Sequence, residues 1–159
     1  MKHENDKKEL MVHVHSIFES ISGEAGGFLQ GTWCTFVRLA MCNLRCVWCD
    51  TKDAQHLSES SHLMTIQQIV EMVQGYDNER VIITGGEPLV QYEGTIELLR
   101  SLIYYDFKVQ VETNGSIALP EDVHPVNWVM DYKCPSSEQQ DAMLEIPMLI
   151  RNIHQVQRG

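Results

Sequence analysis

Three of the five cysteines in the chain lie within eight residues, in the segment CNLRCVWCDT. Cys42, Cys46 and Cys49 have the spacing Cys-x3-Cys-x2-Cys, and Asp50 and Thr51 follow them directly. In a reducing compartment, thiols grouped this closely more often bind a metal or take part in chemistry than form disulfides. A structural metal site usually has four protein ligands, whereas this segment supplies three. The spacing therefore raises the question of what three thiolates bind.

Three interpretations of the cysteines compete. They could be unrelated structural thiols, or they could form a Cys3His zinc site that His56 completes. They could also hold an iron–sulfur cluster through three thiolates. One iron of a four-iron cluster would then be open to a substrate or cofactor, as the open position of a catalytic zinc site is. The tight spacing favours the cluster.

A second unusual segment is Gly85-Gly86-Glu87-Pro88, which follows a strand-like run. Two adjacent glycines allow a ligand to approach the backbone closely, and Glu87 could offer a carboxylate to an ammonium group. Alone, the segment would equally suit a turn from strand to helix, with the proline near the helix start. Its occurrence behind the cysteine segment favours a functional interpretation.

The remaining sequence alternates between strand-like and helix-like segments. Thr65 and Gln68 form a capping-box pattern at the start of the first predicted helix. Residue content and apolar spacing predict strands at 11–18, 33–39, 80–84, 108–112 and 127–132, and helices at 65–73, 92–103 and 138–146. This alternation predicts an α/β fold with a parallel sheet. Ligands gather at the C-terminal ends of such strands, where the sequence places Cys42, the Gly-Gly-Glu-Pro segment, Thr113-Asn114-Gly115 and Lys133.

Composition and charge exclude several classes of function. The net charge of -10 leaves no basic surface for general nucleic-acid binding. No apolar run approaches the ~20 residues that a membrane-spanning helix needs. Residues 1–10 are charged and precede no apolar segment, so they are expected to be a disordered lead-in and not a secretory signal. A cytoplasmic protein with one domain over residues 11–159 is expected, and neither nucleic acid nor membrane is an expected partner.

The cysteine spacing, with Trp48 just before the last cysteine, resembles the radical S-adenosylmethionine (SAM) superfamily. In that superfamily, the open iron of a [4Fe–4S] cluster chelates SAM, and an electron from the cluster cleaves SAM to a 5′-deoxyadenosyl radical that abstracts hydrogen from a substrate. The protein supplies position and excludes water. The resemblance implies a partial, truncated (βα)6-type barrel with parallel strands. The C-terminal part is expected to be shortened, because few residues follow 137.

Five segments together resemble the 7-carboxy-7-deazaguanine synthase family of queuosine and deazapurine biosynthesis. They are FESISGE (18–24), FVRLAMCNLRCVWCDTK (36–52), TGGEP (84–88), ETNGS (112–116) and DYKCPSS (131–137). The resemblance implies a carbon–nitrogen lyase that converts 6-carboxy-5,6,7,8-tetrahydropterin to 7-carboxy-7-deazaguanine, with ring contraction and loss of ammonia. It also implies that SAM is used catalytically and that the enzyme depends on Mg²⁺. An electron donor such as flavodoxin or ferredoxin and a homodimer are expected.

The resemblance assigns roles to individual residues. Cys42, Cys46 and Cys49 would bind the cluster. Thr51 would bind Mg²⁺, since a hydroxyl suits a hard cation that keeps part of its water shell. Arg38 would pair with the substrate carboxylate through its planar fork. The expected SAM-binding residues are Trp48, Cys49, Asp50, Gly86, Glu87, Asp131, Tyr132 and Lys133. The other expected substrate contacts are Ile21, Ser22, Gly23, Glu24 and Thr84.

One residue departs from the family pattern, and two alternative functions compete with the synthase. Met41 stands where the family favours glycine, so strain of ~1 kcal/mol or more is expected if its φ is positive. Glu112 has no assigned role.

One alternative function is an activase that installs a glycyl radical on a partner protein, and the other is a truncated, inactive homologue that binds a cluster. The Cys-Asp-Thr, ETNGS and DYKCPSS segments favour the synthase over the activase.

Overall fold

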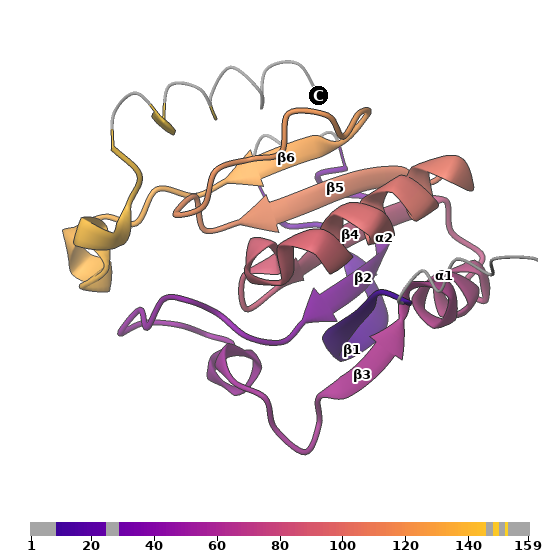
Figure 1. Ribbon diagram of the computed structural model, residues 1–159, viewed down its shortest axis with the longest axis horizontal. Helices are drawn as coiled ribbons and strands as arrows, with labels where there is room; N and C mark the ends of the chain where they lie inside the picture. The colour runs from indigo at the N-terminus through magenta and orange to yellow at the C-terminus, as the bar shows by residue number, and fades with distance from the viewer. Residues whose placement is uncertain (1–8, 25–28, 146–147, 150–151, 153–159) are drawn as a thin grey trace, which may run out of the picture.

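The computed structural model describes residues 9–24, 29–145, 148–149 and 152, so most of the expected lead-in 1–10 lies outside the described residues. A six-stranded sheet in the order β3-β1-β2-β4-β5-β6 organises the chain, and two helices lie on one of its faces (Figure 1). The strands are Met11–Ile21 (β1), Trp33–Leu39 (β2), His62–Thr65 (β3), Arg80–Gly85 (β4), Lys108–Thr113 (β5) and Asn127–Met130 (β6), and the helices are Ile66–Gln74 (α1) and Tyr92–Tyr104 (α2).

The sheet is mixed, with its parallel part next to its antiparallel part. Strands β2, β4, β5 and β6 pair in parallel, which confirms the predicted parallel sheet for these four. Strand β1 pairs antiparallel with β2 and with β3, so the prediction of parallel strands is wrong for this part. The connection between β1 and β2 is residues 22–32, which is shorter than the dozen or so residues that a parallel crossover needs.

The main core lies between the sheet and the two helices. The predicted capping box of α1 is confirmed, because the Gln68 N–H donates to the Thr65 Oγ1 (3.1 Å) and the Thr65 N–H donates to the Gln68 Oε1 (2.9 Å). The apolar face of α1 packs against α2 and the sheet. Its buried residues are Ile66, Ile69, Val70 and Val73. The helices thus leave the opposite face of the sheet available for a site.

Two predicted details differ from the structure. The short edge strand β3 was not predicted, because two of its four side chains are exposed and it carries no clear alternation. The predicted helix 138–146 is wrong over its described part, where residues 138–145 contain only the 3₁₀ turn Gln140–Ala142. Within the described ranges, no helix has the length and apolarity needed to cross a membrane.

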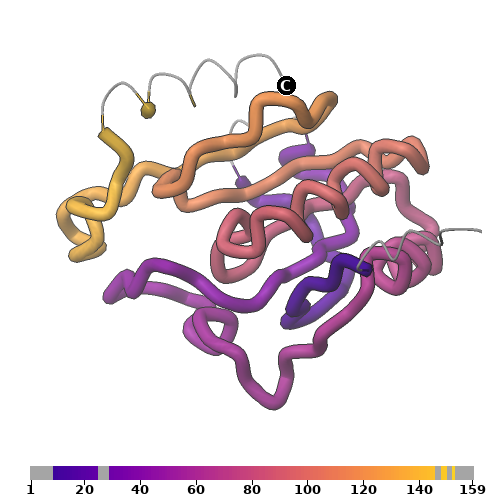
Figure 2. Tube along the Cα trace, in the orientation of Figure 1, coloured from indigo at the N-terminus to yellow at the C-terminus, as the bar shows by residue number. Residues whose placement is uncertain are grey.

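The C-terminal ends of the parallel strands meet at one end of the molecule. The loop that follows β2 and the segment that follows β6 both lie there (Figure 2). The Val47 N–H from the first segment donates to the Ser137 carbonyl of the second (3.3 Å). Segments separated by some ninety residues are therefore brought together where parallel sheets bind ligands.

Candidate active site

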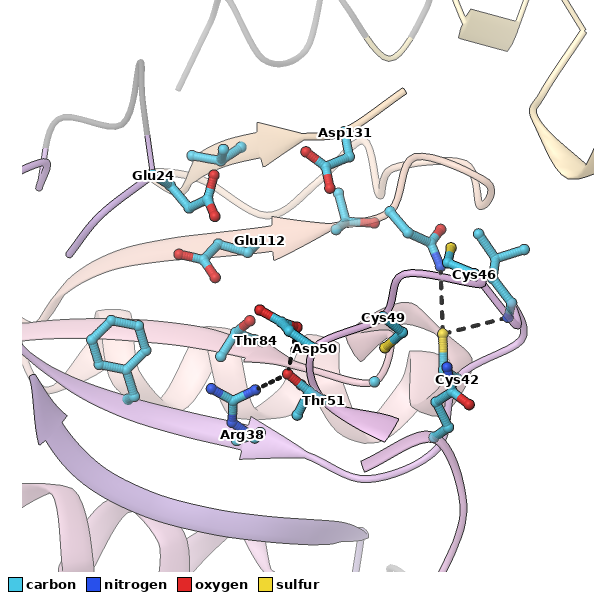
Figure 3. A pocket seen from close by; sticks show the side chains of 18 of the residues that line it. Glu24, Arg38, Cys42, Cys46, Cys49, Asp50, Thr51, Thr84, Glu112 and Asp131 are labelled. Atoms are coloured by element: carbon cyan, nitrogen blue, oxygen red, sulfur yellow. Dashed lines mark hydrogen bonds between the residues drawn. The ribbon is translucent and has the colours of Figure 1, made fainter. Parts of the chain in front are cut away.

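A cavity of about 530 Å³ opens at the C-terminal ends of the parallel strands. All three clustered cysteines line it, together with residues from every strand except β3. Figure 3 shows the cysteines on one side of this cavity, Glu24, Glu112 and Arg38 on the other, and Asp50 and Thr51 between them. We call the first side the cysteine end and the second the acidic end.

The loop that carries Cys42 is held by close backbone packing against the end of β4. The Gly86 N–H donates to the Leu39 carbonyl (2.9 Å), and the Glu87 N–H donates to the Met41 carbonyl (2.8 Å). A Cβ at Gly86 would lie 2.1 Å from the Met41 oxygen, and one at Gly85, where φ is +142°, would lie 2.1 Å from the Leu39 oxygen. The glycines are therefore required for contact between two chain segments as well as for access to the cavity.

Met41 adopts a left-handed conformation, which is the condition under which strain was expected at this position. Its φ is 73°, and it immediately precedes Cys42. A side chain at such a φ costs roughly 1 kcal/mol or more relative to glycine. The surrounding hydrogen bonds to the Leu39 and Met41 carbonyls hold this conformation in place.

The three clustered thiols are free and partly buried. Burial raises the pKa of the Cys42 thiol, and the charge of Glu87 acts in the same direction. Hydrogen bonds from the Leu44 N–H (3.4 Å) and the Asn114 side chain (3.8 Å) to the Cys42 Sγ act against this rise. Two N–H donors directed at one sulfur suit a thiolate that carries negative charge.

The geometry of the thiols fits a cluster better than a single metal ion. Within the described ranges, no group of three His, Cys, Asp or Glu side chains converges closely enough to hold one ion. A tetrahedral zinc needs its sulfur ligands within about 2.3 Å of one point, whereas each thiolate of a four-iron cluster binds a different iron. His56 turns toward the Arg45 guanidinium (3.3 Å) and does not line the cavity, so the Cys3His alternative is not supported.

Glu87 lies beneath the cavity and not in its wall. The side chain is fully buried, and its carboxylate accepts hydrogen bonds from the Leu89 N–H (3.0 Å), the Thr113 hydroxyl (2.9 Å) and the Asn114 N–H (2.7 Å). Burial raises the pKa of Glu87, although these three hydrogen bonds act in the opposite direction. The geometry gives Glu87 a positioning role between β4 and β5, and its expected contact with SAM stays a prediction.

Arg38 and Thr51 meet at the centre of the cavity. The Arg38 guanidinium donates to the Thr51 Oγ1 (3.0 Å), and this hydroxyl donates to the Asp50 Oδ1 (2.8 Å). The guanidinium also lies over the Phe18 ring, 5.6 Å from its centroid. Phe18 in turn stacks on Phe36, with ring centroids 5.3 Å apart. This region combines a fixed cation, a hydroxyl and a flat apolar wall.

Glu112 brings a partly buried carboxyl group to the acidic end. Burial raises the pKa of Glu112, and the nearby carboxylate of Glu24 adds to the rise. The Thr84 hydroxyl and the positive charge of Arg38 act against it. Two carboxyl groups beside one guanidinium can accept N–H donors from a ligand while the guanidinium binds an anion.

Lys133 follows strand β6 and lines the cavity at the cysteine end. Its ammonium group donates to the Asp131 Oδ2 (2.7 Å) and lies 5.3 Å from the centroid of the Trp48 ring. Burial alone would lower the pKa of Lys133, but the interactions with Asp131 and with the Cys46 and Cys42 sulfurs raise it overall. A cation is thereby fixed next to the thiols.

Most of the residues expected at the site line the cavity, but three do not. Ser22, Glu87 and Tyr132 are absent from its described lining. The Ser22 side chain is buried and points away from solvent, and Tyr132 is half-exposed. Lining residues without a predicted role are Phe18, Ser20, Phe36, Leu44, Gln55, Gly85, Glu112, Thr113, Asn114 and Val129. Several of these belong to the FESISGE and ETNGS segments, which was the available signal.

Three free thiols in the loop after β2 line one cavity together with fixed cations and carboxylates from the ends of the parallel strands, an arrangement that suits an α/β protein that holds a cluster and a small molecule. A model of the radical SAM superfamily matches residues 37–124, and the chain belongs to this superfamily. Membership implies a [4Fe–4S] cluster and SAM. The described donors fit these groups, with three thiols for the cluster and one open side of the cavity beside them.

Within the superfamily, the chain is most clearly similar to curated proteins that share one name. The chain is 39% identical over 130 residues to the 7-carboxy-7-deazaguanine synthase of Clostridium acetobutylicum, which covers 79% of this chain and 58% of the relative. It is 42% identical over 110 residues to the enzyme of the same name from Hyperthermus butylicus, covering 69% of this chain and 46% of the relative. The chain thus spans about half the length of the curated relatives that it matches.

A solved structure confirms the fold class. The crystal structure of QueE from Escherichia coli aligns with a TM-score of 0.66 and 19% sequence identity, over 94% of this chain and 78% of that one. The mixed, mostly parallel sheet described above therefore resembles the fold of that solved structure.

Proposed function

We propose that this chain catalyses the 7-carboxy-7-deazaguanine synthase reaction, in which 6-carboxy-5,6,7,8-tetrahydropterin is converted to 7-carboxy-7-deazaguanine with loss of ammonia. The main support for the proposal is the set of segments that one cavity brings together. The five sequence segments that resemble the synthase family all contribute residues to its lining, although they are spread from residue 18 to residue 137. The names of the curated relatives support the same reaction.

The cluster and SAM, when bound, supply the radical that abstracts hydrogen from the substrate. The proposed roles of the chain itself are to hold and orient these groups. Cys42, Cys46 and Cys49 would bind the cluster. Trp48, Asp50, Gly86, Asp131 and Lys133 line the adjoining space, where they would contact SAM.

The acidic end has the chemistry to recognise a carboxylated pterin. The Arg38 guanidinium would bind the carboxylate bidentately. The stacked rings of Phe18 and Phe36 offer an apolar surface to a flat ring system. The carboxylates of Glu24 and Glu112 can accept hydrogen bonds from the ring N–H groups. Ile21, Gly23 and Thr84 complete the proposed substrate contacts.

Mg²⁺ is proposed to bind at Thr51, between the two ends. The Thr51 hydroxyl already contacts Asp50, so a second oxygen lies 2.8 Å away. Mg²⁺ commonly takes one or two protein oxygens and keeps several waters. The Thr51 oxygen accepts one hydrogen bond from Arg38, and its second lone pair stays free for the ion.

The proposed partners are the pterin and a one-electron donor such as flavodoxin or ferredoxin. Assembly into a homodimer and a cytoplasmic location stay predictions. Sedimentation analysis of the cluster-loaded chain tests the dimer.

The test of the proposed function is anaerobic reconstitution with iron and sulfide, followed by incubation with SAM, Mg²⁺, dithionite and the tetrahydropterin. The expected result is formation of 7-carboxy-7-deazaguanine with SAM acting catalytically, and no product from the Cys46→Ala variant. Cleavage of SAM without any turnover of the pterin would contradict the synthase. Radical formation on a partner glycine under the same conditions would establish the activase in its place.

A further inference from the structure

Asn114 lies between the buried Glu87 side chain and the partly buried Cys42 thiol. Its backbone N–H donates to the Glu87 Oε2 (2.7 Å). Its side-chain amide donates to the Cys42 Sγ (3.8 Å) and to the Asn43 Oδ1 (3.1 Å). The Asn114 side chain is nearly buried, with 8% exposure. One residue therefore directs N–H groups at the carboxylate and at the thiolate.

The orientation of the Asn114 amide is fixed by its neighbour. The Ser116 N–H (2.9 Å) and hydroxyl (2.6 Å) both donate to the Asn114 Oδ1. Because the oxygen has two donors, the amide nitrogen must face Cys42 and Asn43. The Ser116 hydroxyl also accepts a hydrogen bond from the Asn43 side chain (2.8 Å). The ETNGS segment thus braces the loop that carries the first cysteine.

We infer that Asn114 is a positioning residue that sets the reduction potential of the cluster through its hydrogen bond to the Cys42 sulfur. The inference rests on the cluster of the proposed function, and it is independent of pterin turnover. Reduction adds negative charge to the cluster, and hydrogen bonds to the ligand sulfurs stabilise that charge. The Asn114 N–H therefore raises the potential, and it offsets the fully buried Glu87 carboxylate nearby.

The experiment is a redox titration of the anaerobically reconstituted chain, followed by electron paramagnetic resonance, without SAM or pterin. Asn114→Ala removes the donor, so the midpoint potential should shift to a more negative value. Asn114→Asp keeps the size of the side chain and replaces the donor with a charged oxygen, so its shift should be in the same direction and larger. The near-isosteric aspartate also keeps the test valid if the alanine variant fails to fold or to hold a cluster.

Asn43→Ala is the matched control. It removes the loop contacts of Asn43 to Ser116 and Asn114 but leaves the donor to the sulfur. Its midpoint potential should stay at the wild-type value, even if the cluster is released faster during gel filtration. Equal potentials in wild type and Asn114→Asp would overturn the inference. A change in midpoint potential in Asn43→Ala as large as that in Asn114→Ala would also overturn the inference, because a less tightly held cysteine loop would then explain both changes.

Discussion

The two ends of the cavity are built in different ways. At the cysteine end, the position of Cys42 follows from backbone contacts: Gly86 lies against Met41, and Glu87 and Asn114 hydrogen-bond beneath them. At the acidic end, the contacts are between side chains on strands, with Arg38 bound to Thr51 and two carboxyl groups facing it.

Because of this difference, substitutions at the two ends should affect different properties, namely binding of the cluster and turnover of the substrate. A backbone contact that closes to 2.1 Å upon adding one carbon atom has no room to adjust, whereas charged side chains at the acidic end can be replaced without moving a strand. Changes at the cysteine end should therefore alter cluster content and stability. Changes at the acidic end should alter turnover while the cluster stays bound.

Gly86→Val should give the largest effect. The new side chain would overlap the Met41 carbonyl and displace the loop that carries Cys42, and an incompatible glycine replacement costs more than ~1 kcal/mol. Most of the cluster iron should be lost, as measured by iron and sulfide analysis after reconstitution. Gly75→Ala is the control, because its Cβ would lie 3.2 Å from the Met72 oxygen in an ordinary backbone conformation. Normal iron content in Gly86→Val would break the contrast between the ends.

Thr51→Ala should have the next largest effect. Loss of the hydroxyl removes the proposed Mg²⁺ ligand, and a ~1 Å misplacement of a substrate can cost on the order of 100-fold in rate. The cluster content should not change, since Thr51 contacts Arg38 and Asp50 and no cysteine among the described hydrogen bonds. Thr51→Ser keeps the oxygen and should retain much of the turnover. If both variants turn over the pterin equally, or if a chelator leaves the wild type fully active, the metal role is wrong.

Arg38→Lys should raise the KM for the pterin by roughly tenfold, with little change in iron content. Lysine keeps the charge but loses the planar fork, and one charged hydrogen bond contributes ~1.5–3 kcal/mol. Steady-state kinetics with the tetrahydropterin measure the change. An unchanged KM would place the substrate carboxylate elsewhere in the cavity.

The difference in stability between the Met41→Gly and Met41→Ala variants should be the smallest effect. Both variants lose the side chain, but only glycine relieves the positive φ of 73°. The glycine variant should be more stable than the alanine variant by ~1 kcal/mol, as measured by urea unfolding of the cluster-free chain. An alanine variant of equal or higher stability would show that the backbone at this position is not strained.

The sequence predicted the elements of the parallel sheet and the place of the site better than it predicted individual contacts. Periodicity located α1 and the four parallel strands, because a helix face and buried strands leave local patterns. The antiparallel direction of β1 and the edge strand β3 were missed, since pairing depends on partners distant in sequence.

Glu87 illustrates why site roles are harder to predict. A carboxylate after two glycines has the chemistry of a ligand contact, and nothing local reveals its hydrogen bonds to Thr113 and Asn114, which lie 26 and 27 residues further along. The family's preference for glycine in place of Met41 raised a positive φ as a condition, and the structure shows that φ, whereas nothing in the sequence indicated that Gly86 packs against Met41.

We propose that the cysteine end and the acidic end face each other across one cavity. Hydrogen would then pass directly from the pterin at the acidic end to the adenosyl group of SAM at the cysteine end. Transfer of deuterium tests this most directly. The reconstituted chain is incubated with SAM, Mg²⁺, dithionite and ring-deuterated 6-carboxytetrahydropterin, and the recovered SAM and any released 5′-deoxyadenosine are analysed by mass spectrometry. We expect deuterium in these adenosyl compounds from wild type. Normal product formation without deuterium in either compound would contradict direct transfer.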